Sequence, residues 1–266
     1  MPHDRHTGRH NDRQGRVLLV GAGPGAADLL TLRALRAIES ADVILFDALV
    51  GDEVRALFPA SARVIEVGKR GHRASTSQDF INRLMVRFAR TGAIVVRLKG
   101  GDPSIFGRAA EERAFLELHG VPVQVIAGVT TASAAAAEFG FALTTRAKAR
   151  RVIFATGRTL KGPTGDWAAA ADPASTLCLY MACADIGSIT TQLLAAGLPA
   201  STPAIAAIDV SRPGSRLVTS TLGRIAADLG RNKTTSPVFV CIGEACADAA
   251  ATVDQTLLGQ ATVSAS

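Results

Sequence analysis

Residues 17–25 read Val-Leu-Leu-Val-Gly-Ala-Gly-Pro-Gly, an apolar strand that runs into a glycine-rich turn. A helical pattern follows, with an apolar face formed by Leu29, Leu32, Leu35 and Ile38. A strand, a glycine turn and a helix in this order are typical of a parallel α/β sheet. This stretch therefore predicts an α/β fold whose first strand lies in such a sheet.

Strands alternate with helices along most of the chain. Apolar runs predict strands over residues 16–20, 42–46, 63–67, 94–98 and 121–126, and again over 151–155, 176–181, 203–209, 216–220 and 237–242. Helices are predicted over residues 77–90, behind an N-cap at Thr76 or Ser77, and over residues 131–139. The first sheet is expected to be mostly parallel. The second set has more strands per residue and fewer strong helices, which predicts a mixed sheet.

The pattern changes near Phe141, where the basic link 143–150 precedes the second set of strands. We expect an N-terminal α/β domain over residues 16–142 and a C-terminal α/β domain over residues 143–250. Residues 1–15 and 251–266 lack periodic apolar positions, so a disordered extension and a flexible tail are expected there.

Composition narrows the class of protein. Of 266 residues, 48% are apolar and 20% are charged, which excludes an intrinsically disordered chain. The uncharged run over residues 121–137 is broken by Pro122 and Gly128, so no membrane span and no membrane partner is expected. The first residues are polar and show no secretory signal, and we expect a cytoplasmic protein.

The charge balance favours an acidic small molecule as the ligand. Lysine and arginine number 29 against 23 aspartates and glutamates, a net charge of +6. Aromatic residues make up only 5% of the chain, which argues against single-stranded nucleic acid as a partner.

The four cysteines form two C-x4-C pairs, Cys178 with Cys183 and Cys241 with Cys246. This is not the spacing of zinc or redox sites, and no histidine accompanies them, so no metal site is expected. Cys178 and Cys241 fall inside apolar runs and are predicted to be small core residues.

The glycine turn also nearly matches the dinucleotide-binding pattern G-x-G-x-x-G/A, with Ala26 at the third position. Asp47 ends the next strand, where such folds keep an acid for the ribose. Pro24 argues against this interpretation, because it removes one backbone N–H from a turn that would cradle a pyrophosphate. The turn by itself leaves both interpretations open.

Further motifs follow in a specific order. They are Gly21-Ala-Gly-Pro-Gly25, Asp42-Val-Ile-Leu-Phe-Asp47, Gly68-Lys69-Arg70, Lys99-Gly-Gly-Asp-Pro103, Gly128-Val-Thr130-Thr131 and Leu179-Tyr180-Met181. In this order they resemble the tetrapyrrole methyltransferases of the cobalamin and siroheme pathways, over about residues 17–243. The resemblance is strongest to members that methylate uroporphyrinogen III twice, at ring carbons 2 and 7, giving precorrin-2.

The resemblance implies a homodimer of two-domain α/β subunits that binds S-adenosylmethionine in a cleft between the domains and releases S-adenosylhomocysteine. It implies that Asp47 is the proton acceptor and Lys69 the proton donor. The matched cofactor-binding positions are Pro24, Gly100, Gly101, Asp102, Ile105, Thr130, Thr131, Met181 and Val210. Val210 stands where the family usually has glycine, so it offers only backbone or apolar contact.

Ordinary structural roles compete with some of these assignments. Two glycines and an acid at the carboxyl end of a strand favour a ligand over a plain turn at residues 100–102. Thr130 and Thr131 open a helix and suit an N-cap, a role that is compatible with cofactor contact. A methionine at a strand end, such as Met181, is more often a core residue.

A substrate with eight carboxylates calls for a basic site. Arg70 and Arg146 are the foremost candidates, followed by Arg97, Lys99, Lys148 and Arg150. The chain departs from the family at Thr145, which replaces a usual histidine, at Ala109-Ala110, which replace two glycines, and at Ser104, which replaces phenylalanine. The first departure concerns the substrate, and the other two concern the cofactor loop.

Three alternatives remain open at this point. A sister enzyme of the family acts on a later precorrin. An NAD(P)-dependent oxidoreductase would use the glycine turn for a dinucleotide, and a tetrapyrrole-binding protein would have no catalytic activity. The residues do not indicate whether the product feeds siroheme, cobalamin or haem d1.

Overall fold

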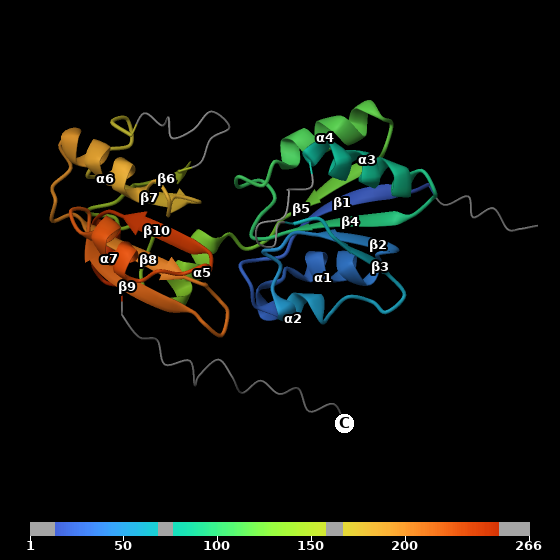
Figure 1. Ribbon diagram of the computed structural model, residues 1–266, viewed down its shortest axis with the longest axis horizontal. Helices are drawn as coiled ribbons and strands as arrows, with labels where there is room; N and C mark the ends of the chain where they lie inside the picture. The colour runs from blue at the N-terminus through green and yellow to red at the C-terminus, as the bar shows by residue number, and fades with distance from the viewer. Residues whose placement is uncertain (1–13, 69–76, 158–166, 250–266) are drawn as a thin grey trace, which may run out of the picture. The chain divides into compact units, whose positions relative to one another are not determined.

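The computed structural model describes residues 14–68, 77–157 and 167–249 (Figure 1). Contacts divide the chain into two compact units, Met1–Val129 and Thr130–Ser266. The expected boundary after residue 142 therefore falls inside the second unit, because helix α5 (Thr131–Glu138) packs against the second sheet. Except for residues 14 and 15, the predicted N-terminal extension and C-terminal tail lie outside the described residues.

The first unit contains a fully parallel sheet, as predicted. Its strands are β1 (Arg16–Gly21), β2 (Val43–Phe46), β3 (Arg63–Glu66), β4 (Ile94–Lys99) and β5 (Val123–Ile126), in the order β3-β2-β4-β1-β5. Because all five run in one direction, the loops that follow them all leave the same edge of the sheet.

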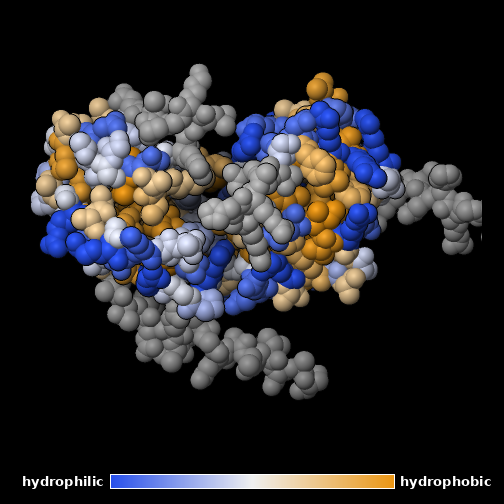
Figure 2. Space-filling model, in the orientation of Figure 1, coloured by the Kyte–Doolittle hydropathy of each residue, from blue (hydrophilic) through white to orange (hydrophobic). Residues whose placement is uncertain are grey.

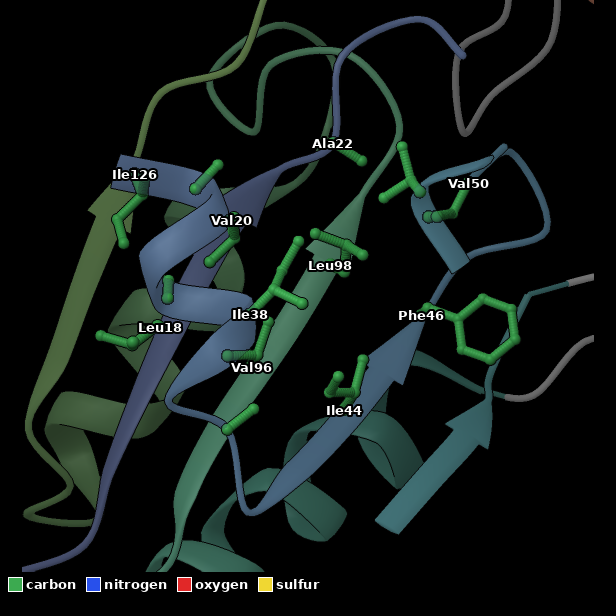
Figure 3. Close-up of a cluster of buried hydrophobic side chains, with 14 of the residues drawn as sticks. Leu18, Val20, Ala22, Ile38, Ile44, Phe46, Val50, Val96, Leu98 and Ile126 are labelled. Carbon is green, nitrogen blue, oxygen red and sulfur yellow. The ribbon is translucent and has the colours of Figure 1, made fainter. Parts of the chain in front are cut away.

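Helices cover both faces of this sheet. One face packs on α1 (Leu32–Glu39) and α2 (Asp52–Arg55) through the apolar cluster drawn in Figure 3, in which Ile38 and Ile44 are fully buried. The other face packs on α3 (Gln78–Ala89) and α4 (Ala109–Leu118) through a cluster that includes Met85 and Leu116. The central strand β4 is buried along its whole length.

Local caps explain where two helices of this unit begin. Ser77 is the N-cap of α3, as predicted, and its hydroxyl accepts a hydrogen bond from the Phe80 N–H. The first glycine turn does not run directly into a helix. A short 3₁₀ turn, η1 (Ala27–Leu29), comes first, and Thr31 then caps α1 by accepting from the Ala34 N–H.

The second unit contains a mixed sheet, again as predicted. Its strands are β6 (Arg151–Thr156), β7 (Ser175–Tyr180), β8 (Pro203–Ile208), β9 (Arg216–Thr221) and β10 (Val238–Ile242), in the order β6-β7-β10-β8-β9. Strands β6 and β7 are parallel, and β10 is antiparallel to both β7 and β8. The carboxyl ends of β6, β7 and β8 therefore share one edge.

One face of the second sheet packs on α6 (Ile186–Ala195) and α7 (Ile225–Arg231), and a 3₁₀ turn, η2 (Glu244–Cys246), follows β10. Cys178 and Cys241 are fully buried neighbours on β7 and β10, with their sulfur atoms 4.0 Å apart as free thiols, which confirms their predicted place in the core. Within the described ranges, no helix is long and apolar enough to span a bilayer.

Candidate functional site

Glycines join three loops at the carboxyl edge of the first sheet. The Gly23 N–H donates to the Gly101 carbonyl (3.2 Å), and the Gly101 N–H donates to the Gly23 carbonyl (2.7 Å). A Cβ built on Gly128 would lie 2.3 Å from the Gly101 oxygen, and one on Gly21 would lie 2.5 Å from the Gly128 nitrogen. The loops after β1, β4 and β5 are therefore in direct backbone contact, which only glycine permits there.

Asp102 joins two of these loops through its carboxylate. Its Oδ1 accepts from the Ser104 N–H (2.7 Å), and its Oδ2 accepts from the Gly128 N–H (2.9 Å). The next predicted position, Ile105, is half-buried and donates its N–H to the Asp102 carbonyl (3.1 Å). Asp102 thus has a structural role in the loop whether or not a ligand is bound.

The outer side of this loop can accept a ligand. Gly101 has φ +69°, and a Cβ built on it would meet no atom of the described residues within 4 Å. Gly100 lies against Leu49, because a Cβ built on Gly100 would be 2.8 Å from the Leu49 Cβ. Leu49 itself is 53% exposed. Pro24, next to the Gly23–Gly101 bridge, is half-buried. Exposed backbone next to apolar side chains suits a ligand with both polar and apolar parts.

The first glycine turn does not form a phosphate cradle. The Gly23 N–H is already donated to Gly101, and Pro24 has none. The Ala27 N–H donates to the Glu53 carboxylate (3.1 Å), whose negative charge opposes a phosphate at that position. These contacts, together with Pro24, argue against a dinucleotide site at this turn.

Asp47 follows β2 and belongs to a chain of alternating charges. Arg97 Nη2 lies 2.5 Å from Asp47 Oδ1, and Arg97 Nε lies 3.2 Å from Glu112 Oε1. The Lys99 ammonium lies 3.0 Å from both oxygens of Glu112, and the Gln78 amide donates to Oε1 of the same carboxylate (3.0 Å). The Asp47 side chain is 27% exposed, and Glu112 is fully buried.

This network corrects one expectation. Arg97 and Lys99 are 3% and 4% exposed and are engaged by Glu112, so they are not available to pair with carboxylates of a substrate. Burial, followed by the neighbouring Arg97 charge, lowers the pKa of Lys99 from its ordinary value. Sequence reasoning missed Glu112. The signal was present, since two cations in the middle strand of a buried parallel sheet need a buried partner.

Two predicted residues of this edge lie outside the described residues. Lys69, the expected proton donor, and Arg70, an expected substrate contact, come directly after Gly68. A Cβ on Gly68 would lie 2.0 Å from the Ala48 nitrogen, so the chain that leads to them passes against the residue after Asp47.

In the second unit, Tyr180 holds the start of α5. Its hydroxyl lies 2.6 Å from Thr130 Oγ1 and accepts a hydrogen bond from the Ala132 N–H (3.3 Å). Thr130 is the N-cap residue, yet its side chain makes no cap hydrogen bond to its own helix. The expected capping role of Thr130 is therefore performed by Tyr180, which the sequence analysis quoted as part of a motif but to which it assigned no role. Thr131 is the first residue of α5 and is half-buried.

Met181 and Val210 both follow strands whose carboxyl ends share one edge. Met181 is 51% exposed with φ +53°, so the ordinary interpretation as a core methionine is wrong. Val210 is 4% exposed, and it lies between Asp209 (φ +57°) and Ser211 (φ +58°). Left-handed backbone at non-glycine residues is strained and tends to occur at functional sites.

The basic link places Arg146 on the surface. Thr145 and Ala149 form an isolated antiparallel bridge, and Arg146 and Lys148 are exposed in the turn between them. The Lys148 ammonium lies 3.8 Å from a Glu244 carboxylate oxygen. Arg146 therefore keeps its place as a candidate for binding an anionic substrate.

Together these features define the class of protein: a two-unit α/β protein with a candidate small-molecule site at the carboxyl edge of its parallel sheet. Comparison with known proteins identifies the family. The family of tetrapyrrole (corrin/porphyrin) methylases matches residues 16–226. The chain belongs to this family, which confirms the resemblance seen in the motifs.

Individual relatives agree with this assignment. The chain is 44% identical over 234 residues to uroporphyrinogen-III C-methyltransferase of Pseudomonas aeruginosa, covering 88% of this chain and 95% of the relative. It is also 44% identical over 233 residues to the chloroplastic S-adenosyl-L-methionine-dependent uroporphyrinogen III methyltransferase of Arabidopsis thaliana. That match covers 86% of this chain and 63% of the longer plant protein.

The fold is also found in a solved structure. Uroporphyrin-III C-methyl transferase from Thermus thermophilus, complexed with S-adenosylhomocysteine, superposes with a TM-score of 0.75 at 39% identity. The match covers 87% of this chain and 98% of that one.

Proposed function

We propose that this protein is an S-adenosylmethionine-dependent C-methyltransferase that methylates uroporphyrinogen III twice, at ring carbons 2 and 7, and yields precorrin-2. The observation that carries the proposal is the match along nearly the full length of the Pseudomonas aeruginosa relative. The glycine-joined edge of the first sheet supports it, because the turn that resembles a dinucleotide cradle has its Gly23 and Ala27 N–H groups engaged elsewhere.

S-adenosylmethionine supplies a methyl group on a sulfonium sulfur, which is electrophilic enough to react with an electron-rich pyrrole carbon. In the first unit, Gly100, Gly101, Asp102, Ile105 and Pro24 would bind it through the open side of the glycine-joined loops. In the second unit, Thr130, Thr131, Met181 and the backbone of Val210 would bind it at the strand ends. The left-handed Met181 fits such a role because its side chain is half-exposed.

Asp47 and Lys69 would move the protons. Methylation of a pyrrole carbon leaves a cationic macrocycle, which returns to neutrality by losing a proton. Asp47 is suited to accept it, since its carboxylate is partly exposed and is oriented by Arg97. The resemblance assigns the complementary role of proton donor to Lys69, which lies outside the described residues. With the carboxylate held in place, proton transfer requires little rearrangement of the protein.

Arg70 and Arg146 would bind the acetate and propionate groups of the substrate. An arginine forms two parallel hydrogen bonds with a carboxylate, which orients as well as binds it. The exposure of Arg146 in the basic turn supports this assignment. A methyltransferase that acts on a later precorrin would use the same cofactor. The two candidate enzymes differ in the tetrapyrrole that they methylate, so a test with each substrate distinguishes them.

A homodimer is part of the proposal. The first unit exposes several large apolar side chains, and Figure 2 shows apolar residues gathered on its visible face. Val64, on the edge strand β3, is 45% exposed, and Phe80, at the start of α3, is 56% exposed. A second copy of the chain could cover such residues. Sedimentation of the purified protein would test this.

One incubation tests the function. Purified protein is mixed with S-adenosylmethionine and uroporphyrinogen III without oxygen, and the product is read by mass. We expect a product heavier by two CH2 units, because each added methyl group is accompanied by the loss of one proton. Calorimetry in parallel should show binding of S-adenosylhomocysteine and none of NAD(H). Binding of NAD(H) at micromolar concentration, with no binding of S-adenosylhomocysteine, would instead favour the oxidoreductase.

A further inference from the structure

Helix α5 is fastened at both ends to segments that carry proposed cofactor-binding residues. At its start, the Tyr180 hydroxyl bonds to Thr130 and receives the Ala132 N–H. At its end, Glu138 Oε2 accepts from the Ser211 N–H (2.8 Å), in the loop that contains Val210. These two ties link three segments, namely residues 130–131, Met181 and Val210, through one helix.

The tie at Tyr180 depends on one hydroxyl group. The ring packs edge-on against Phe154 and Phe239, with centroid distances of 5.9 and 5.4 Å. Burial, as the largest cause, raises the pKa of Tyr180, so the phenol keeps its proton and can donate to Thr130 while accepting from Ala132. Since Tyr180 is the last residue of β7, it also fixes the position from which Met181 departs.

The tie at Glu138 lies where a carboxylate is otherwise unfavourable. Glu138 is the last residue of α5, and the last turn contains no basic residue. The carbonyl end of a helix carries a partial negative charge, which repels a carboxylate. The Ser211 N–H offsets this repulsion by donating a hydrogen bond to the Glu138 carboxylate. Ser211 belongs to a loop with left-handed backbone at residues 209 and 211.

We propose that Tyr180 and Glu138 are positioning residues, which hold the cofactor-binding segments of the second unit in the geometry that binds S-adenosylmethionine. This inference rests on the proposed function. Neither residue takes part in proton transfer. Their contribution is to binding, because each fixes a segment before the cofactor arrives.

The variants Tyr180→Phe and Glu138→Ala test this. The first removes one oxygen and keeps both ring contacts, and the second removes the acceptor of the Ser211 N–H. Loss of these hydrogen bonds, two in Tyr180→Phe and one in Glu138→Ala, should weaken binding of S-adenosylhomocysteine by about three- to tenfold in each variant. The KM for S-adenosylmethionine should rise equally, and kcat at saturating cofactor should stay within about twofold of the parent.

Two matched controls separate positioning from general damage. Thr176→Val removes a hydroxyl from the same strand as Tyr180, and Thr176 Oγ1 is buried with no hydrogen-bond partner among the described residues. Glu117→Ala removes an acid from the last turn of α4, where the side chain is 57% exposed and paired with Arg113. Both should keep the parental affinity for S-adenosylhomocysteine.

The outcomes are distinct. Parental affinity in both Tyr180→Phe and Glu138→Ala overturns the positioning role while the proposed function stands. A fall in kcat with unchanged affinity overturns it as well. If Tyr180→Phe does not fold, Glu138→Ala decides alone. A parent protein that binds no S-adenosylhomocysteine contradicts the proposed function and this inference together.

Discussion

Arg97 reaches from β4 to the residue after β2, so that its Nη2 lies 2.5 Å from Asp47 Oδ1, and its own side chain is only 3% exposed. The carboxylate proposed to accept a proton is thus held from inside the fold by a cation that solvent cannot reach. Glu112 holds the other side of the same guanidinium. The proposed reactive group and the buried core of the first unit are therefore electrostatically connected.

Asp47→Asn and Lys69→Ala should lose turnover and keep cofactor binding. A positioned acid or base contributes roughly 10²–10⁴-fold in rate, and asparagine preserves the shape of Asp47. The measurement is single-turnover methyl transfer, with affinity for S-adenosylhomocysteine and thermal melting as controls. If both variants fold, bind and react within about threefold of the parent, the assignment is wrong.

Glu112→Gln should destabilise the first unit by about 3–5 kcal/mol, because Arg97 and Lys99 would remain buried with one carboxylate between them. The double variant Lys99→Met with Glu112→Gln removes one charge of each sign and should recover much of that loss. Chemical denaturation measures both. A double variant no more stable than Glu112→Gln alone would show that charge balance is not what Glu112 supplies.

The contribution of Lys99 to stability should depend on pH. Burial lowers its pKa in the folded protein from the ordinary 10.5, so between the lowered value and 10.5 the unfolded chain binds more protons at this site. Its contribution therefore rises with pH through that window and is lost as pH falls through the folded value. As pH rises toward 10.5, the parent should gain stability relative to Lys99→Met. The control is Lys148→Met, because Lys148 is exposed. If the stability difference between parent and variant changes equally with pH for Lys99→Met and Lys148→Met, the prediction is refuted.

Two glycine substitutions should have different effects. In Gly128→Ala, the added Cβ would lie 2.3 Å from a backbone oxygen, so the loops must separate, at a cost of about 3 kcal/mol. In Gly101→Ala, only the left-handed backbone is strained, at a cost of about 1 kcal/mol. Gly101→Ala should thus fold but bind S-adenosylhomocysteine weakly, because its methyl group enters the open space of the loop. Melting and calorimetry compare the two. Parental cofactor affinity in a folded Gly101→Ala protein would contradict a ligand at this loop.

Arg146→Ala should raise the KM for the tetrapyrrole several-fold and leave binding of S-adenosylhomocysteine unchanged. Added salt should weaken substrate binding in the parent more than cofactor binding, because it screens exposed charge pairs. Kinetics at two salt concentrations test this. An equal salt response of the two ligands would count against a site that binds carboxylates.

The strands were predictable because they are local. All ten apolar runs became strands within a residue or two at each end, since a short buried run flanked by turn residues has few other solutions. The division of the chain was not. The basic link after Phe141 marked a change of pattern, but Thr130 and α5 already pack with the second sheet, a choice made by tertiary contacts such as that of Tyr180.

Charged and polar side chains were harder to place than apolar ones. Arg97 and Lys99 were candidates for binding substrate carboxylates, whereas the structure pairs both with the buried Glu112 from another element. Residue type and position alone favoured a core role for Met181, against the cofactor role that the resemblance implied, because its left-handed backbone leaves no mark in the sequence. The order of the motifs indicated which positions are candidates for the cofactor site. The hydrogen bonds that hold these positions could not be predicted, because they form between segments far apart in the sequence.

The division of the chain at Val129 has a consequence for its synthesis. The first unit consists of one continuous segment, and its last strand, β5, ends only three residues before that division. All five strands of the first sheet are therefore present once β5 has left the ribosome. The first unit can then fold while the second unit is still being translated. Thr130, where the second unit begins, must then wait for Tyr180 to be made before α5 is fastened.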